Sequence, residues 1–279
     1  MPSKITWLAS YPKSGNTWMR MFLASYSSDA PVDINHTGAF SYDDMAKYTY
    51  QVVSPKPIDE LEAHEMAAIR GAYLVHMTNF AQEGRLFMKT HSCIGDVADY
   101  PMIPQEFTDS AIYMVRDPRD VVCSYAHHCN DSIDETIDFM LKPAATISHK
   151  TRFNALGTWE EHFKSWLADD LDFPRIFVKY EDMVEKPEAL FRKVVEFLGW
   201  ELDEDKLKRA IANTEFETLK KQEKTKGFKE QSTAGVNFFR QGKVGKWKDQ
   251  LSDKQEKRIS DAFTETMEKL GYGSYSNRE

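Results

Sequence analysis

Short, almost continuous apolar runs alternate along the chain with longer stretches in which apolar residues recur every three or four positions. The short runs are typical of parallel strands buried on both faces, and the longer stretches are typical of amphipathic helices. The predicted strands are Ile5–Ser10, Leu86–Lys89, Ala111–Val115 and Ile176–Lys179. The predicted helices are Thr17–Ser27, Pro118–His128, Thr158–Leu171, Pro187–Leu198 and Lys254–Leu270, with Gly199 and Gly271 as C-caps.

Alternation of strands and helices predicts an α/β fold, a parallel sheet flanked by helices. Ligands of such sheets bind beyond the carboxyl ends of the strands, so polar segments at those ends are expected to meet at one edge. The segments are 11–17, 89–91 and 116–124. Two regions are less regular. We expect residues 29–84 to form a helix-and-loop excursion, part of a substrate cover, and residues 221–246 to form a long, mobile, basic loop.

The length of 279 residues allows one large domain or two smaller ones, and we expect a single domain over 1–279. The balance of 36 basic against 44 acidic residues, a net charge of −8, argues against a general nucleic-acid binder. Nine Lys or Arg but only two Glu fall between Lys220 and Lys248. This patch suggests one compact anionic ligand, although composition alone is explained more simply by a solvated charged loop.

The cysteines Cys93, Cys123 and Cys129 form no CxxC and are too few for a disulfide framework. No apolar run approaches the roughly 20 residues that cross a bilayer. The first predicted strand begins after four residues, which leaves no room for a signal peptide. We therefore expect a soluble, cytoplasmic protein.

The segment Ser10–Trp18 joins the first strand to the first helix through Pro, Gly and small polar residues, which is the layout of a phosphate-binding loop. Backbone N–H groups at a helix start point at a bound phosphate and favour its negative charge. The spacing nearly fits G-x-x-x-x-G-K-[ST]. Ser10 stands at the first Gly, Asn16 replaces the Lys, and a lysine appears instead at Lys13. The loop is thus predicted to bind phosphate without the lysine that usually reaches the phosphates of ATP.

Residues 11–18 read YPKSGNTW and resemble the 5′-phosphosulfate loop YPKSGTTW of the PAPS-dependent sulfotransferases, with Asn16 the only difference. Four further motifs follow in the family's order: Lys89-Thr90-His91 (K-T-H), residues 116–125 (R-[ND]-P-[RK]-D-x-x-x-S), residues 180–183 (Y-E-D-[ML]) and residues 240–248 (R-K-G-x-x-G-D-W-K). Five motifs in order identify the chain as a member of this family, similar to its compact bacterial or tailoring-type members. The resemblance implies the sulfotransferase fold.

The resemblance implies PAPS, 3′-phosphoadenosine 5′-phosphosulfate, as co-substrate and no metal. It assigns the 5′-phosphosulfate to Lys13, Ser14, Gly15, Asn16 and Thr17. It assigns the 3′-phosphate to Arg116 and Ser124, with Arg240, Gln241 and Gly242 as a second wall. Trp18, Tyr180 and Phe216 are implied around the adenine, Phe216 more weakly because Glu215 departs from the pattern. Arg119 is expected at the surface.

The implied reaction moves a sulfuryl group to a hydroxyl of a small-molecule acceptor and releases adenosine 3′,5′-bisphosphate. His91 is the candidate general base, because an imidazole of near-neutral pKa accepts a hydroxyl proton well. Lys13 is placed to touch the bridging oxygen, and Lys89 to stabilise the sulfuryl oxygens, which lowers the energy of the transition state. His127 and His128 are adjacent on a helix and face different ways, so we interpret them as structural rather than as a metal pair.

Departures from the family pattern limit some assignments. Gln241 replaces a family Lys, and Lys246 replaces an Asp. The dimerisation segment K-x-x-x-T-V-x-x-x-E of animal members has Asp253 in place of Val and Lys257 in place of Glu, so that dimer mode is doubtful and a monomer or a homodimer stays open.

The acceptor and two rival functions also stay open. Aromatic residues between 29 and 84 and between 130 and 155 favour an aromatic or apolar acceptor; they include Phe40, Tyr42, Tyr48, Tyr50, Phe80 and Phe139. The rival functions are a nucleotide kinase, against which Asn16 argues, and a non-catalytic bisphosphate-binding protein. No nucleic-acid or membrane partner is expected.

Overall fold

The structure is a computed structural model, and it describes residues 4–36, 40–44, 46–81, 84–149, 152–230, 236–240 and 242–273. The chain divides into two compact units. Unit 1 comprises Met1–Tyr11, Gly38–Met114 and Pro143–Phe177, and unit 2 comprises Pro12–Thr37, Val115–Lys142 and Val178–Glu279. The expected single domain over 1–279 stays a prediction.

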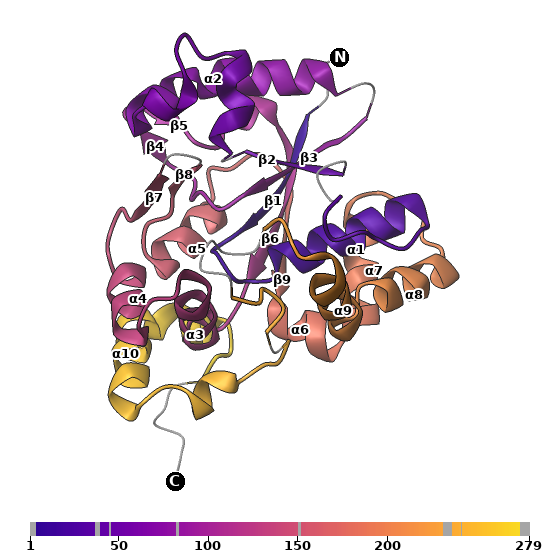
Figure 1. Ribbon diagram of the computed structural model, residues 1–279, viewed down its shortest axis with the longest axis vertical. Helices are drawn as coiled ribbons and strands as arrows, with labels where there is room; N and C mark the ends of the chain where they lie inside the picture. Colours follow the sequence, from indigo (N-terminus) through magenta and orange to yellow (C-terminus); the bar gives the residue numbers. More distant parts are fainter. Residues whose placement is uncertain are drawn as a thin grey trace. The chain divides into compact units, whose positions relative to one another are not determined.

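A five-stranded sheet has the strand order β2-β3-β1-β6-β9 (Figure 1). The strands are β1 (Ile5–Ser10), β2 (Ser41–Asp43), β3 (Leu86–Thr90), β6 (Thr108–Val115) and β9 (Arg175–Lys179). β1 pairs in parallel with β3 and β6, and β3 pairs in parallel with β2. The α/β fold with a parallel sheet is therefore confirmed, and all four predicted strands are present.

The burial of the central strands explains why the sequence predicted them. Every residue of β1 and of β3 is buried, so neither strand shows the alternation of a half-exposed strand. Ala9 of β1 lies opposite both Thr90 of β3 and Tyr113 of β6. The three strands therefore end at the same edge. The short strand β2 was not predicted, because three residues are too few for a periodic signal.

Helices and two hairpins complete unit 1. The helices are α2 (Ala63–Phe80), α5 (Trp159–Leu167) and the 3₁₀ turns η2 (Lys47–Val52), η3 (Ile58–Glu60) and η4 (Gln105–Phe107). The hairpins are β4–β5 (Asp96–Val97, Tyr100–Pro101) and β7–β8 (Thr146–His149, Arg152–Ala155). Helix α2 packs against β4–β5 (Figure 1). The prediction for α5 extended four residues too far, because Ala168 already has non-helical dihedrals.

Unit 2 is helical (Figure 1). One group comprises α1 (Asn16–Ser28), α6 (Tyr180–Glu185), α7 (Pro187–Phe197), α8 (Glu204–Asn213) and α9 (Phe216–Lys226). The other comprises α3 (Pro118–Cys129), α4 (Ile133–Met140), η5 (Lys246–Asp249) and α10 (Asp253–Lys269). Gly199 and Gly271 follow α7 and α10 with positive φ, as predicted for C-caps. No helix of the described part of the chain is both long enough and apolar enough to cross a membrane.

Two predictions about unit 2 are wrong. The first is the loop over 221–246, because α9 continues to Lys226. Leu219 of α9, Phe228 and Phe239 pack with Met21 in a buried cluster, which supplies the apolar contacts that stabilise this helix. The second is the surface position of Arg119, which is 4% exposed. Its guanidinium pairs with Asp117 at 2.8 Å and with Glu256 of α10 at 3.1 Å.

Arg70 of α2 is a buried polar centre of unit 1, with 1% of its surface exposed. Its guanidinium donates to Asp44 Oδ2 at 2.5 Å, to the hydroxyl of Tyr50 at 2.7 Å and to the main-chain oxygen of Met102 at 2.5 Å. These bonds tie α2 to the segments on either side of it. Removing one partner of such a pair leaves an uncompensated buried charge.

We expect Arg70→Ala to lower the free energy of unfolding by about 3–5 kcal/mol, because Asp44 then stays buried without its cation. Urea unfolding followed by circular dichroism measures this. Lys257→Ala, which removes an exposed ion pair with Asp261 on α10, is the control and should change the midpoint little. Equal stability of the two variants would contradict the role given to Arg70.

Candidate functional site

The loop before α1 has the backbone of a phosphate cradle. Gly15 caps the helix with φ 99°, and Lys13 also lies in the left-handed region with φ 67°. A Cβ atom added at Gly15 would lie 2.9 Å from Cδ2 of Tyr180. Both the dihedral and the close approach therefore require glycine. The left-handed lysine is uncommon for a non-glycine residue, and such strain is typical of binding sites.

Arg116 connects the loop with two other predicted motifs inside unit 2. Its guanidinium donates to the main-chain oxygens of Lys13 at 3.3 Å and Lys243 at 3.2 Å, and it lies 4.2 Å from the ring centre of Tyr180. Trp18 meets Tyr180 edge-on, with ring centres 6.1 Å apart. The structure thus brings together, within unit 2, residues from four of the predicted motifs.

A fifth contact involves Phe216 and Gly242. Gly242 has φ 61°, and a Cβ atom built on it would lie only 2.3 Å from the Phe216 ring. Phe216 and Trp18 pack against the same buried apolar cluster. The weak match of Phe216 to the family pattern is therefore supported by its position next to the last motif.

Three buried polar atoms of this region have no hydrogen-bond partner among the described residues: Ser14 Oγ, Trp18 Nε1 and Arg116 Nε. Buried polar groups are normally paired, so each such atom needs an explanation. All three can donate a hydrogen bond, and they come from the loop, the start of α1 and the residue after β6. A ligand with several acceptor atoms, such as a nucleotide with more than one phosphate, could supply partners for these donors.

The described contacts of the other predicted nucleotide-binding residues do not bring them together at one point. The Lys13 ammonium lies 3.8 Å from the ring centre of Phe238. Arg240 is exposed and donates to Gln250 Oε1 at 2.9 Å, and Ser124 is half-buried on α3. Gln241 lies outside the described residues. The predicted meeting of Ser124 and Arg240 with Arg116 at one phosphate stays a prediction.

Within unit 1, His91 follows β3 and is held in one tautomer. Its Nδ1 lies 2.7 Å from the main-chain oxygen of Ser10, the last residue of β1. A carbonyl oxygen only accepts, so Nδ1 carries the proton and Nε2 keeps its lone pair. Burial, and then the charge of Lys89, hold the pKa of His91 well below its usual 6.5. The ring is therefore neutral at physiological pH, which is the form a general base requires.

His162 of α5 supports His91 from behind, and the sequence did not single it out. Its Nε2 donates to the main-chain oxygen of His91 at 3.1 Å, and its Nδ1 accepts from the Tyr113 hydroxyl at 2.7 Å. Burial lowers the pKa of His162 to about 3, so it stays neutral. Its position on the inward face of a predicted amphipathic helix was the available signal.

Lys89 is buried beside an acidic residue that the sequence did not reveal. Asp43 ends β2 opposite Lys89 in the sheet. Its carboxylate accepts from Lys89 Nζ at 3.3 Å and from Arg152 at 2.7 Å. Asp43 thus fixes the ammonium of Lys89 near His91 and brings a second cation, Arg152, to the same place.

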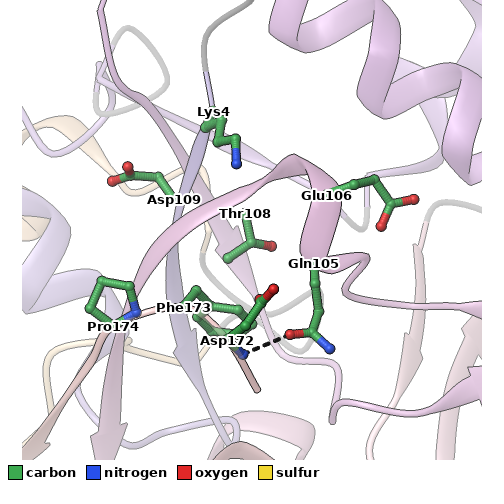
Figure 2. Close-up of a pocket in the computed structure, with 8 residues that line it drawn as sticks. All are labelled: Lys4, Gln105, Glu106, Thr108, Asp109, Asp172, Phe173 and Pro174. Atoms are coloured by element: carbon green, nitrogen blue, oxygen red, sulfur yellow. Dashed lines mark hydrogen bonds between the residues drawn. The ribbon is translucent and has the colours of Figure 1, made fainter. Parts of the chain in front are cut away.

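A hollow at the other end of the sheet does not belong to this site. Figure 2 shows it beside Lys4, before β1, and Thr108, at the start of β6. Its wall is closed by a hydrogen bond from Asp172 N to Gln105 Oε1 at 2.8 Å. The amino ends of the strands lie here, whereas His91 lies at the carboxyl ends.

Among the described residues, no group of three or more His, Cys, Asp or Glu is arranged to hold a metal ion.

Comparison with known proteins decides the family. A model of the sulfotransferase domain matches residues 3–271. The chain belongs to the sulfotransferase domain family. Sulfotransferase 1B1 of Mus musculus is 26% identical over 273 residues, which cover 93% of this chain and 81% of that protein. Cytosolic sulfotransferase 17 of Arabidopsis thaliana is 24% identical and covers 95% and 75%.

Two solved structures have the same fold. Retinol dehydratase in complex with retinol and PAP has a TM-score of 0.65 at 18% identity, covering 96% of this chain and 82% of that one. Mouse sulfotransferase SULT7A1 complexed with PAP has a TM-score of 0.61 at 21% identity, covering 95% and 84%. The sequence-based identification of the family and of its fold is therefore confirmed, and the protein is a sulfotransferase.

Gly15→Ala tests the cradle. We expect a loss of activity of at least about tenfold and destabilisation of about 1–2 kcal/mol, because alanine is strained at this φ and its methyl group meets Tyr180. Transfer assays and urea unfolding measure the two effects. The control is Gly71→Ala, where an added Cβ meets no described atom within 4 Å. Helix propensity should make that variant slightly more stable. Wild-type activity of Gly15→Ala would refute the assignment.

The pH profile tests the state of His91. A base whose pKa is depressed stays deprotonated until the pH falls below that lowered value. We expect kcat/KM for sulfuryl transfer to stay level from about pH 8 to about pH 6.5 and to fall only at lower pH. A profile that is half-lost at or above pH 6.5 would show that the ring is not held neutral as described.

Proposed function

We propose that this sulfotransferase moves a sulfuryl group from PAPS to the hydroxyl of a small-molecule acceptor and releases adenosine 3′,5′-bisphosphate. The observation that supports the donor most directly is the set of buried donor atoms without a partner, Ser14 Oγ, Trp18 Nε1 and Arg116 Nε, in the predicted nucleotide motifs of unit 2. The solved relatives named above contain PAP, which is the product that PAPS leaves. The anion-binding backbone at Gly15 fits the 5′-phosphate.

The nucleotide would be held by residues of unit 2. Lys13, Ser14, Gly15, Asn16 and Thr17 would bind the 5′-phosphosulfate. Arg116 suits the 3′-phosphate because its planar fork binds phosphate oxygens at two points. The further 3′-phosphate contacts are Ser124, Arg240, Gln241 and Gly242, and the adenine contacts are Trp18, Tyr180 and Phe216.

The transfer step uses the acid–base and charge properties described for His91 and the two lysines. His91 Nε2 takes the proton of the acceptor hydroxyl as its oxygen attacks sulfur in line. The bond from sulfur to the bridging oxygen breaks, and the electron pair leaves with the bisphosphate. Lys13 and Lys89 stabilise the charge on the leaving and sulfuryl oxygens, which is an effect larger in the transition state than in the ground state.

The acceptor follows from the sequence only in part. An aromatic or apolar body stays the sequence-based prediction. Tyr48 and Phe80 are exposed, whereas Tyr50 stacks on Tyr73 inside the core. Asp43 and Arg152, close to His91, add a place for a polar substituent next to the reacting hydroxyl. A cytoplasmic location, and a monomeric or homodimeric state, stay predictions.

Replacement of the base separates catalysis from binding. We expect His91→Gln to lower kcat by about 10²–10⁴-fold, because general-base catalysis is lost, while affinity for adenosine 3′,5′-bisphosphate is retained. Transfer from labelled PAPS to a panel of hydroxylated acceptors measures the first, and isothermal titration calorimetry measures the second.

His76→Gln, on α2, is the matched control and should leave both quantities unchanged. Normal turnover of His91→Gln would exclude it as the base. Failure of the wild-type protein to transfer sulfuryl groups to any acceptor, with intact bisphosphate binding, would favour the non-catalytic alternative.

A further inference from the structure

Arg20 of α1 contacts the phosphate loop from inside unit 2, although it belongs to none of the five motifs. Its side chain is 3% exposed. Its Nε donates to Asn16 Oδ1 at 3.1 Å, and its Nη2 donates to Thr17 Oγ1 at 3.2 Å. Both partners lie in the first turn of α1, so the guanidinium reaches back to the helix end that faces the proposed 5′-phosphate.

The carboxylate of Glu230 accepts hydrogen bonds from both the Arg20 guanidinium and the Thr17 hydroxyl. Its oxygens accept from Arg20 Nη2 at 2.7 and 2.6 Å, and Oε2 also accepts from the Thr17 hydroxyl at 3.2 Å. Glu230 comes from the segment after α9, more than 200 positions along the chain from Arg20. Its side chain is 23% exposed, so this anion is reachable from solvent while its arginine is not.

The chemistry of this contact matches that of a bound phosphate. A guanidinium and a hydroxyl at a helix start are typical ligands of phosphate oxygens, and a carboxylate offers two oxygens to the same donors. Two anions repel one another and compete for one set of donors. The Thr17 hydroxyl therefore cannot hold Glu230 and a 5′-phosphate in the same way at once.

We propose that Arg20 is a further 5′-phosphate-binding residue and that Glu230 is its placeholder, displaced when the phosphate of the donor binds. This inference rests on the proposed function. In the protein without nucleotide, Glu230 neutralises the positive charge of Arg20, and a buried arginine requires such a partner. Displacement of the carboxylate breaks the contacts that Glu230 makes with Arg20 and Thr17 of α1.

The hydrogen bond from Arg20 also involves Asn16, the residue at which the loop departs from the family pattern. Its Oδ1 accepts from Arg20 Nε. The Asn16 side chain is thus oriented by Arg20. The replacement of the family's threonine by asparagine is consistent with a site that has recruited an arginine one turn later.

The test compares two ligands that differ only in the 5′-phosphate. We expect Glu230→Gln to bind adenosine 3′,5′-bisphosphate about five- to tenfold more tightly, since the competing charge is gone while the shape is kept. Its affinity for adenosine 3′-monophosphate should not change. Arg20→Gln should weaken the bisphosphate and again leave the monophosphate unaffected. Isothermal titration calorimetry gives all of these affinities.

Glu217→Gln is the matched control, because Glu217 is on α9 of the same unit and its side chain is 82% exposed. It removes the same charge and should change neither affinity. Thermal melting of each variant shows that it is folded. Weaker or unchanged bisphosphate binding by Glu230→Gln, or an equal change for both ligands, would overturn the placeholder role. Failure of the wild-type protein to bind the bisphosphate would instead refute the proposed function, and the placeholder with it.

Discussion

The hydrogen bond between His91 Nδ1 and the main-chain oxygen of Ser10 is the contact on which the proposed base of unit 1 depends. It exists because β1 and β3 run in parallel and in a register that ends both strands together. The bond selects the tautomer, and burial of the same ring keeps it neutral. His162 fixes the main chain on the other side. The register of β1 and β3 therefore determines that Nε2 of His91 is the nitrogen with a lone pair that can accept a proton.

The two units contribute different kinds of chemistry. Unit 1 holds a neutral imidazole, the proposed base, and an ammonium that is paired with a carboxylate from the neighbouring strand. Unit 2 supplies glycine-dependent backbone and donors whose partners are absent from the described chain.

The sequence was most informative where local chemistry alone determines the structure. The continuous apolar run of β1 predicted its bounds correctly, and Gly15 was recognisable from the spacing of the phosphate-loop motif; its φ and its close approach to Tyr180 explain why that position is glycine. His91 was recognisable from its place after a strand. Asp43 and Glu230 could not be found in this way, since their importance arises from partners 46 and 210 positions away. α9 was missed because Met21, in the apolar cluster against which it packs, is also far away in the sequence.

The contact between Lys13 and the Phe238 ring has a consequence for hydration. An ammonium over an aromatic face has already exchanged part of its water shell for the ring's electrons. If Lys13 binds the donor as proposed, its ammonium starts from a partly dehydrated state, and less water has to be removed when the phosphosulfate binds. The Phe238 ring would then hold the Lys13 ammonium in a partly dehydrated state before the donor binds. The left-handed backbone of Lys13 keeps this ammonium close to the phosphate-binding loop.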